Sequence, residues 1–166
     1  MKRPVAIVYT SQTGFTARYA GMLARAAMIP AYDLNDRKER PAPGSPVIYL
    51  GWLRAEHIKG LAQARRHYDI QAVCAVGLSR GDQQRTEKLA AASRLGDVPL
   101  FYLRGGYAPE KVKGLDALMM KSFTKLLSKS PEGGGQPEML ELVRNGADFV
   151  SEDRLTPVLS WLEFHS

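Results

Sequence analysis

The sequence predicts an α/β protein with a five-stranded parallel sheet that is covered by helices on both faces. Short apolar runs alternate along the chain with segments whose apolar residues recur at helical spacing. The runs are apolar throughout, as expected for strands that are buried on both sides. Parallel neighbours also need a crossover between them, which the intervening helices supply. The 166 residues, 45% of them apolar, fit a single domain spanning residues 1–166.

The expected elements alternate regularly as far as residue 103. A polar, proline-rich stretch at 36–46 interrupts them and is expected to form a loop. In chain order the expected elements are a strand at 5–9, a helix at 16–27, strands at 31–34 and 47–50, a helix at 58–66, a strand at 72–76, a helix at 84–95 and a strand at 100–103.

The C-terminal part of the chain departs from this alternation. A long helix is expected at 115–129, a Gly-rich loop at 130–137 and a short helical stretch at 139–144. Thr156 and Pro157 provide an N-cap and a first-turn proline for a last helix through Trp161 and Leu162. The fifth connection is therefore elaborated, without a second core.

Composition excludes several classes of protein. No apolar stretch approaches ~18 residues, so no membrane span is expected, and the run 5–9 is too short for a secretory leader. Cys74 is the only cysteine, which excludes an internal disulfide; between Val73 and Ala75 it is expected to be a core residue. The three histidines are scattered and no metal site is expected. We expect a cytoplasmic protein.

The net charge of +6 is distributed unevenly. Residues 1–129 carry 21 Lys/Arg and 10 Asp/Glu, giving +11, whereas residues 130–166 carry 2 and 7, giving −5. The basic segment 1–129 is compatible with a solvated surface, or with binding to an anionic ligand, a lipid surface or an acidic partner. Nucleic acid is not expected, because the basic residues form no dense run with interleaved aromatic residues.

The loop after the first strand is the first candidate site. In an open parallel sheet, ligands bind beyond the carboxyl ends of the strands, where the strand order reverses. Hydroxyl side chains, a glycine and the free amides of a helix start can surround an anion there, although the same residues could simply cap the helix. The loop matches neither the GxxxxGK[ST] nor the GxGxxG motif. Its residues are Ser11, Gln12, Thr13, Gly14, Phe15 and Thr16.

Residues 11–16 resemble the phosphate-binding loop of flavodoxins, [ST]-x-T-G-x-T, in the position where that family carries it. Further stretches resemble the flavodoxin-like branch akin to the menaquinone-dependent protoporphyrinogen oxidase of bacteria; they are 47–53, 58–61, 75–79, 103–107 and 118–121. The resemblance implies the strand order 2-1-3-4-5 and a non-covalently bound FMN. It also implies that the phosphate lies in the first loop, the ring lies between the loops after strands three and four, and electrons pass through the exposed ring edge.

The resemblance assigns roles to twelve residues. Hydroxyl groups of Ser11, Thr13 and Thr16 would bind the phosphate, together with backbone amides of Gln12, Gly14 and Phe15. The ring would lie between Gly51, Trp52 and Leu53 on one side and Gly77, Leu78 and Ser79 on the other. Trp52 is expected to contact the ring, although it could instead cover the core. Arg54 and Arg80 stand where flavodoxins are acidic, which departs from the low potential and basic partners of that family.

Two other functions remain open beside that of an electron carrier. One is a flavin-dependent oxidase that acts on a porphyrin or a quinone, which the residues do not separate from a carrier. The other is a serine hydrolase, because residues 77–81 match GxSxG. Its formal triad is Ser79, Asp116 or Asp148, and His165, but the penultimate His165 is poorly placed to be held rigidly. A response-regulator receiver is excluded, since Ser11 and Gln12 do not form its acidic pair.

The helix expected at 115–129 is a candidate partner surface. A basic series lies on this helix or just before it, beside apolar residues of the helix, so the helix could cover the core with a solvated basic face or rest on an anionic membrane surface near a quinone pool. Of the adjacent Met119 and Met120, one is expected to face solvent or a partner. The partner would be a redox protein or a small quinone or porphyrin. The basic and apolar residues are Lys111, Lys113, Lys121, Lys125 and Lys129 with Met119, Met120, Phe123 and Leu127.

Overall fold

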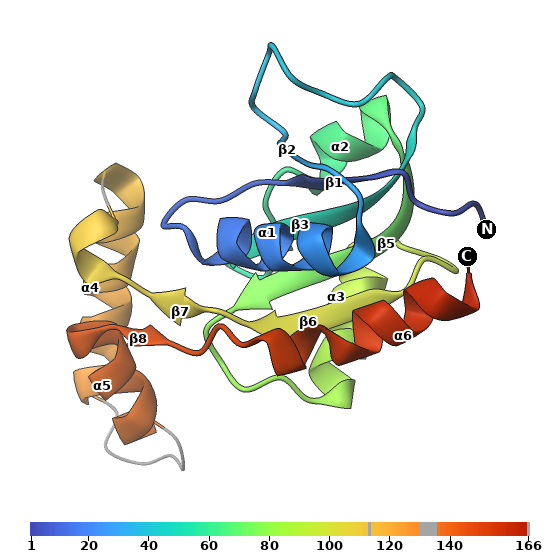
Figure 1. Cartoon of the computed structure of the whole chain (residues 1–166). Helices are drawn as coiled ribbons and strands as arrows, with labels where there is room; N and C mark the ends of the chain where they lie inside the picture. The colour runs from blue at the N-terminus through green and yellow to red at the C-terminus, as the bar shows by residue number, and fades with distance from the viewer. Residues whose placement is uncertain (113, 130–135, 166) are drawn as a thin grey trace.

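The computed structural model describes residues 1–112, 114–129 and 136–165 (Figure 1). Its main sheet has the order β2-β1-β3-β5-β6, in which all neighbours are parallel, and β4 pairs antiparallel with β3. Counted among the parallel strands alone, this is the order 2-1-3-4-5 of flavodoxin-like doubly wound sheets, which confirms the predicted fold class. The strands are β1 (Ala6–Tyr9), β2 (Ala31–Asp33), β3 (Pro46–Arg54), β4 (His57–Ile58), β5 (Asp69–Gly77) and β6 (Leu100–Arg104).

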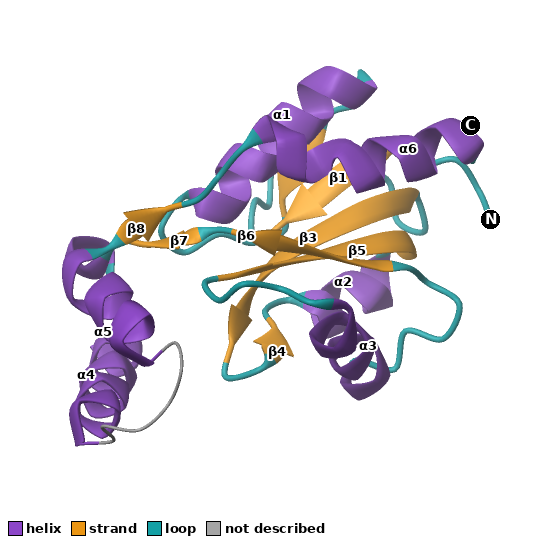
Figure 2. Cartoon of the chain, turned by 90° about the horizontal axis from the view of Figure 1, so that it is seen from below, coloured by secondary structure: helices purple, strands orange, loops and turns teal. Residues whose placement is uncertain are grey.

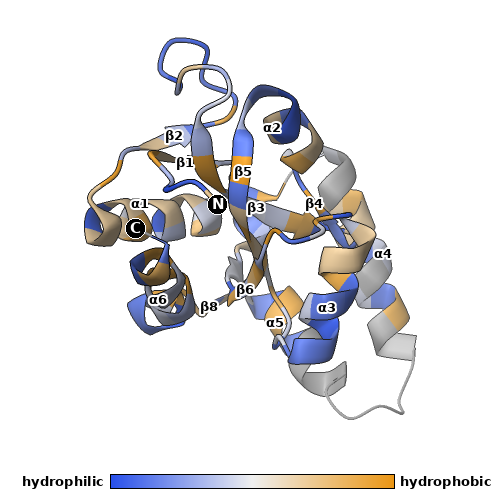
Figure 3. Ribbon diagram, turned by 90° about the vertical axis from the view of Figure 1, so that its right-hand side faces the viewer, coloured by the Kyte–Doolittle hydropathy of each residue, from blue (hydrophilic) through white to orange (hydrophobic). Residues whose placement is uncertain are grey.

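Helices cover both faces of the sheet (Figure 2). The helices α1 (Phe15–Ala27) and α6 (Thr156–Phe164) lie on one face, and α2 (Leu61–His67) and α3 (Gln83–Ala92) lie on the other. Successive residues of a strand point to opposite faces of the sheet. Because helices cover both faces, consecutive residues of β1 are buried in two different cores. Ile7 contributes to the core under α1 and α6, whereas Val8 contributes to the core under α2. Hydrophilic residues lie on α2 and α3, as expected of helices with a solvent-facing side (Figure 3).

A helical hairpin stands beside the carboxyl ends of the strands (Figure 1). It consists of α4 (Gly114–Lys129) and α5 (Gln136–Asn145), and a two-stranded ribbon of β7 (Gly106–Tyr107) and β8 (Ala147–Asp148) joins it to the sheet. The helical turns η1 (Pro109–Lys111) and η2 (Glu152–Leu155) flank these elements. The predicted elaboration of the fifth connection is therefore confirmed, while residues 130–135 of the expected Gly-rich loop lie outside the described residues.

The third strand is longer than predicted, and the segment after it was assigned wrongly. Gly51, Trp52 and Leu53 lie within β3 and not in a loop beyond it. Ile58 belongs to β4, so the helix expected from residue 58 begins only at Leu61. The chain can fold back on itself because residue 51 is glycine: a Cβ atom there would lie 2.7 Å from the carbonyl oxygen of Lys59. The strand therefore continues past Gly51 into a hairpin.

The start of the last helix also differs from the prediction. Thr156 is the first residue of α6 and does not cap it, because the turn η2 leads directly into the helix. Ser151 caps this turn instead, its Oγ accepting a hydrogen bond from the amide of Asp153 at 3.3 Å. Pro157 lies in the first turn of α6 as predicted. No helix within the described ranges is both long and apolar enough to cross a membrane.

Candidate functional site

A cleft opens where the loop after β1 meets the ends of β3 and β5, at the point where the strand order reverses. It encloses about 200 Å³. Pockets that surround a ligand usually measure about 300–1,000 Å³, so a ligand here would remain partly exposed. The described lining residues are Ser11, Gln12, Thr13, Phe15, Thr16, Trp52, Leu53, Arg54, Ala55, Val76, Gly77, Leu78, Gly106, Tyr107, Val112, Met119 and Met120.

The loop after β1 is anchored by hydrogen bonds at its first residues. The Oγ1 of Thr10 is buried, donates to the carbonyl oxygen of Lys59 at 2.9 Å and lies 2.9 Å from the hydroxyl of Tyr49. Burial raises the pKa of Tyr49, so its hydroxyl stays protonated at neutral pH. One residue later, Ser11 Oγ accepts a hydrogen bond from the amide of Gly14 at 3.1 Å. These bonds hold the loop tightly at the start of α1.

The first turn of α1 presents backbone amides to this loop. Gly14 is the N-cap residue, with φ 101°, and no side chain caps the helix. Glycine adopts this conformation without the strain that a side chain would add. The amides of Phe15, Thr16 and Ala17 have no carbonyl acceptor one turn earlier in the helix. Thr13 and Thr16 line the cleft beside these amides, and Thr16 is only 2% exposed. The loop therefore combines hydroxyl groups with open amides.

The β3–β4 hairpin forms a flat apolar wall of the cleft. Trp52 lies in register with Val76 of β5, and its carbonyl oxygen accepts the amide of Lys59 at 2.9 Å. The sheet and the hairpin thus hold Trp52 from both sides. It is partly exposed and lines the cleft together with its neighbour Leu53. An aromatic ring held in this way can stack on a flat ligand.

The loop after β5 forms the opposite wall. The Nε of Arg104 donates to the carbonyl oxygen of Leu78 at 3.1 Å, and the amide of Gly105 donates to Gly77 at 2.7 Å. The hydroxyl of Tyr102 donates to the carbonyl oxygen of Ser79 at 2.7 Å. As a result, Gly77 and Leu78 face the cleft, whereas Ser79 is turned toward Tyr102 and does not line it.

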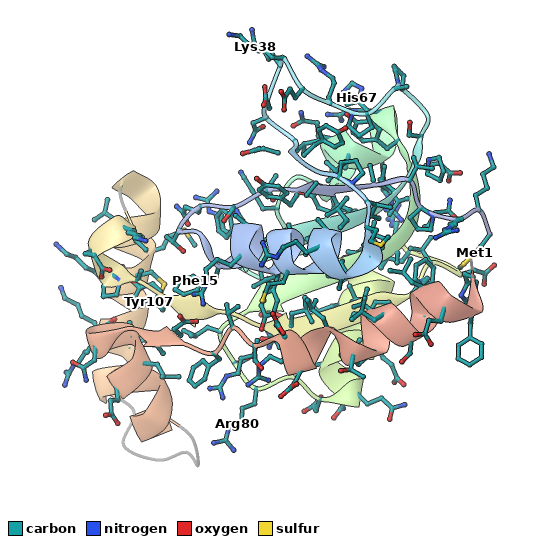
Figure 4. The ribbon with its side chains drawn as sticks, viewed as in Figure 1. Met1, Phe15, Lys38, His67, Arg80 and Tyr107 are labelled. Carbon is teal, nitrogen blue, oxygen red and sulfur yellow. The ribbon has the colours of Figure 1, made fainter. Side chains whose placement is uncertain are left out.

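The helical hairpin closes the third side of the cleft, which the sequence analysis did not place there. Met119 and Met120 of α4 both line the cleft, and Met119 is also 45% exposed, in agreement with the expectation that one of the pair faces solvent or a partner. The wall continues through Tyr107, which lies beside Phe15 (Figure 4). Burial raises the pKa of Tyr107, so it is a neutral hydrogen-bond donor at neutral pH. Nothing in a local pattern reveals that residues 119 and 120 return to the first loop.

Nine of the twelve residues predicted for the site line the cleft, and the other three do not. Gly14 lies behind the loop, Gly51 is buried under the hairpin and Ser79 bonds to Tyr102. The nine residues are Ser11, Gln12, Thr13, Phe15, Thr16, Trp52, Leu53, Gly77 and Leu78. The wall at Tyr107 was not predicted from the sequence. The adjacent Gly105 and Gly106 could have indicated it, because a Cβ atom at residue 106 would lie 2.6 Å from Phe15, which leaves no room for a side chain.

Of the residues of the hydrolase hypothesis, the three whose side chains are described each have another partner. Ser79 Oγ lies 3.2 Å from the hydroxyl of Tyr102, and Asp148 pairs with Arg18 at 2.6 Å. The ring of His165 stacks on Trp161 with centroids 4.9 Å apart, and its Nδ1 lies 2.7 Å from the carbonyl oxygen of the same residue. The side chain of Asp116 lies outside the described residues. The described candidates do not assemble into a triad.

A second hollow lies on the other side of the first loop. It shares Thr13, Phe15 and Tyr107 with the cleft and is also lined by Arg18 and Lys111. Both acidic and basic groups line it, since Glu110 and Asp148 do so too. The hydrogen bond from Arg18 lowers the pKa of Asp148. Within the described part of the chain, no group of three or more His, Cys, Asp or Glu side chains could hold a metal ion.

The chain matches no protein-family model and no curated protein sequence. Among solved structures, it is similar to a crystal structure from Bacteroides eggerthii whose protein is provisionally described as a flavoprotein. The two are 16% identical, with a TM-score of 0.39, over 76% of this chain and 99% of the other. A similarity this low carries no argument about this chain. The fold is therefore identified from the strand order, and the identity of a ligand is inferred from the residues of the cleft.

Proposed function

We propose that the chain binds FMN non-covalently in the cleft and acts as a flavodoxin-like redox protein. The observation that carries this proposal is the loop of Thr13 and Thr16, which places hydroxyl groups and the uncapped start of α1 at the reversal of strand order. A bound flavin would supply the redox chemistry, accepting and passing on electrons. The protein would supply binding, orientation and access.

The first loop is suited to a phosphate group. A helix N-terminus favours an anion because its free amides and its dipole both point toward it. The hydroxyls of Thr13 and Thr16 would add hydrogen bonds, each of about 1.5–3 kcal/mol to a charged group. Ser11 is less suited than expected, because its Oγ already accepts the amide of Gly14. We therefore assign the phosphate to Thr13, Thr16 and the amides of residues 15–17.

The remainder of the cleft is suited to the flavin ring. Trp52 and Leu53 would lie on one side of a flat ligand, and Gly77 and Leu78 on the other. The small enclosed volume would leave one ring edge in solvent, where a partner could reach it. The second hollow beyond Phe15 offers cations but also two carboxylates, which disfavour a second phosphate group. We therefore propose a mononucleotide, with FAD as the alternative.

Whether the protein is a carrier or an enzyme depends on its partner. A redox protein would make it a carrier, and a porphyrin donor with a quinone acceptor would make it an oxidase of the type suggested by the sequence resemblance. The apolar wall of Met119, Met120 and Val112 would accommodate a flat apolar molecule as readily as a protein side chain. The hydrolase hypothesis is not retained, because Ser79 faces Tyr102.

A titration of the purified protein with FMN tests the proposal. FMN fluorescence is followed in parallel with FAD, for the natural chain and for Thr13→Val and Thr16→Val. Each variant keeps its shape but loses one hydroxyl, so we expect FMN binding to weaken by roughly 10- to 150-fold. Thr86→Val is the matched control, because Thr86 lies in α3 and its hydroxyl donates to the carbonyl oxygen of the N-cap residue Asp82. Unchanged affinity in both loop variants would place the phosphate elsewhere, and tighter binding of FAD would exclude a mononucleotide site.

A further inference from the structure

Two walls of the cleft are connected behind the lining residues by one side chain, that of Arg85. One wall is the β3–β4 hairpin, whose tip consists of Ala55 and Glu56, and Ala55 lines the cleft. The other wall is the loop after β5, from which Gly77 and Leu78 line it. The space between these walls, the ring slot, is where we place the flavin ring. Arg85 belongs to α3 and contacts both walls from outside the slot.

Arg85 holds the tip of the hairpin through an ion pair. Its Nη2 donates to Oε1 of Glu56 at 2.9 Å. The backbone of Arg85 is held as well, because its amide donates to Asp82 Oδ1 at 2.7 Å at the N-terminus of α3. The side chain of Arg85 is 30% exposed, so water screens this pair less than a pair at an open surface. The hairpin tip is therefore fixed to the first turn of α3.

Arg85 also contacts the residue that shapes the loop after β5. Its guanidinium carbon lies 5.5 Å from the centroid of the Tyr102 ring, within the range of a cation–π interaction. The hydroxyl of Tyr102 donates to the carbonyl oxygen of Ser79 at 2.7 Å. The loop passes close to this ring because two of its residues are glycines: a Cβ atom at Gly77 would lie 2.5 Å from the Tyr102 hydroxyl, and one at Gly81 would overlap the ring. Tyr102 thus determines the path of the loop, and Arg85 packs on Tyr102.

The orientation of the Arg85 guanidinium is held at an energetic cost. Its Nε is buried and has no hydrogen-bond partner among the described residues. A buried donor without a partner is destabilising, and a rotamer turned toward solvent would hydrate it. The ion pair with Glu56 and the contact with Tyr102 keep the side chain in place in spite of this cost. The arrangement favours the separation of the two walls over the hydration of Arg85.

We propose that Arg85 is a positioning residue that sets the width of the ring slot, by holding the hairpin tip at Glu56 and, through Tyr102, the loop after β5 at a fixed separation. The inference rests on the proposed binding of FMN and concerns how its ring is held. A flat ring gains contact energy only where both walls lie at contact distance. Without Arg85 the hairpin tip can move away from the loop, so that FMN has to order the slot when it binds and binds more weakly.

A double-mutant cycle on the affinity for FMN tests this role. Glu56→Gln removes the ion pair, and Arg85→Met removes both the ion pair and the cation–π contact while keeping an unbranched side chain. We expect FMN to bind about threefold more weakly to Glu56→Gln and about fivefold more weakly to Arg85→Met. The double variant should resemble Arg85→Met alone, because that change already breaks the link. Arg85→Lys keeps a positive charge and should recover part of the affinity.

The visible circular dichroism of the FMN-saturated protein gives a second readout, because it reports how rigidly the flavin ring is held. We expect a smaller flavin signal in Arg85→Met than in the natural chain, a change that lower fold stability alone would not cause. Asp69→Asn is the matched control: it breaks the ion pair with Lys2, of 3.8 Å, at the start of β5 and away from the cleft. It should leave the affinity and the flavin signal unchanged. Far-ultraviolet circular dichroism checks that each variant is folded.

The outcomes distinguish the inference from the function on which it rests. If the natural chain does not bind FMN, the proposed function and the inference both fail. If it binds FMN and the variants at residues 56 and 85 behave like Asp69→Asn, only the inference fails, and any loss of thermal stability then shows a purely structural role. Losses of affinity that add up in the double variant would show that the two residues act separately. Such additivity, or an unchanged flavin signal in Arg85→Met, would overturn the link between the walls.

Discussion

The ring of Phe15 packs directly against the backbone of Gly106, so that a Cβ atom at residue 106 would lie 2.6 Å from Phe15 Cε1. Phe15 is the first residue of α1, and Gly106 begins the ribbon that carries the helical hairpin. This contact joins the first loop to the wall that contains Tyr107. The close contact that Gly106 allows therefore fixes the first loop against the wall that contains Tyr107.

Gly106→Ala is expected to disturb the cleft. The added methyl group would meet Phe15 and also the carbonyl oxygen of Ala147 on the paired strand, so the ribbon or the first loop has to shift. We expect a stability loss of about 1–3 kcal/mol and weaker FMN binding, measured by chemical unfolding and fluorescence titration. Gly21→Ala is the control, because it lies within α1 with room for a methyl group and should stabilise the helix by about 0.5–1 kcal/mol. Unchanged binding in Gly106→Ala would show that Phe15 can move without affecting the loop.

Trp52 should report ligand binding by its fluorescence. It lines the cleft, whereas Trp161 belongs to α6 and packs on Phe101 and His165. We expect FMN to quench the emission of Trp52 in Trp161→Phe, and to quench Trp161 in Trp52→Phe far less. Trp52→Ala should also weaken FMN binding, because it removes an aromatic contact of about 0.5–1.5 kcal/mol beyond its buried area. Similar quenching of both tryptophans would contradict this position for the ring.

The two-residue turn between β3 and β4 stores backbone strain. Ala55 and Glu56 have φ values of 48° and 64°, a conformation that favours Asn and Gly in such hairpins. Ala55→Asn is expected to raise the free energy of unfolding by about 0.5–1 kcal/mol, which corresponds to a few degrees in Tm. Ala26→Asn, at an exposed position of α1, should instead lower stability because Asn is a weaker helix former. Thermal unfolding followed by circular dichroism measures both, and a lower Tm for Ala55→Asn would argue against strain in this turn.

Cys74 should be unreactive in the folded protein. It is fully buried in β5, as predicted from the sequence, and burial raises its pKa to about 12. A thiol reagent at pH 8 should modify it only after unfolding in guanidinium. The unfolded thiol ionises near its ordinary pKa of 9.0, so its contribution to stability is present below pH 9.0 and is lost as the pH rises toward 12. Cys74→Ala should therefore show a smaller loss of stability at alkaline pH. Rapid modification of the native protein would contradict its burial.

The exposed surface of α4 tests the membrane hypothesis derived from the sequence. Leu118 and Leu126 are 61% and 66% exposed, and Lys121 and Lys125 are exposed on the same helix. Each Lys near an anionic leaflet contributes about 1 kcal/mol, which salt screens. If this surface rests on a membrane, the protein should sediment with vesicles rich in phosphatidylserine at low salt and be released at high salt.

Two double variants with the same change in net charge distinguish an effect of this surface from an effect of net charge alone. Lys121→Glu with Lys125→Glu should abolish vesicle binding, whereas Lys38→Glu with Lys88→Glu changes the net charge equally at exposed positions on other elements. An equal loss in both pairs would indicate a general charge effect. No sedimentation of the natural chain at low salt would exclude the membrane role.

Some features of the site were predictable because they depend on short-range patterns. The apolar run before Thr10 and the Gly14 that opens α1 belong to one continuous segment, and this local order is sufficient to place the loop at the end of a strand. The position of Trp52 at the mouth of the cleft was predicted as well, although its strand was predicted to end earlier. Strand ends are difficult to locate where a hairpin extends them, because Ala55 and Glu56 carry no usual turn signature.

The sequence by itself determined the α/β class and the loop of Thr13 and Thr16, because apolar periodicity and a helix start are encoded by residues close together in the chain. Only the tertiary structure decided that Met119 and Met120 line the cleft, that Ser79 turns toward Tyr102, and that Arg54 is the one charge among the described lining residues. Each of these depends on contacts between segments far apart in sequence. Their geometry is determined by how the helical hairpin and the sheet pack together, which no local pattern records.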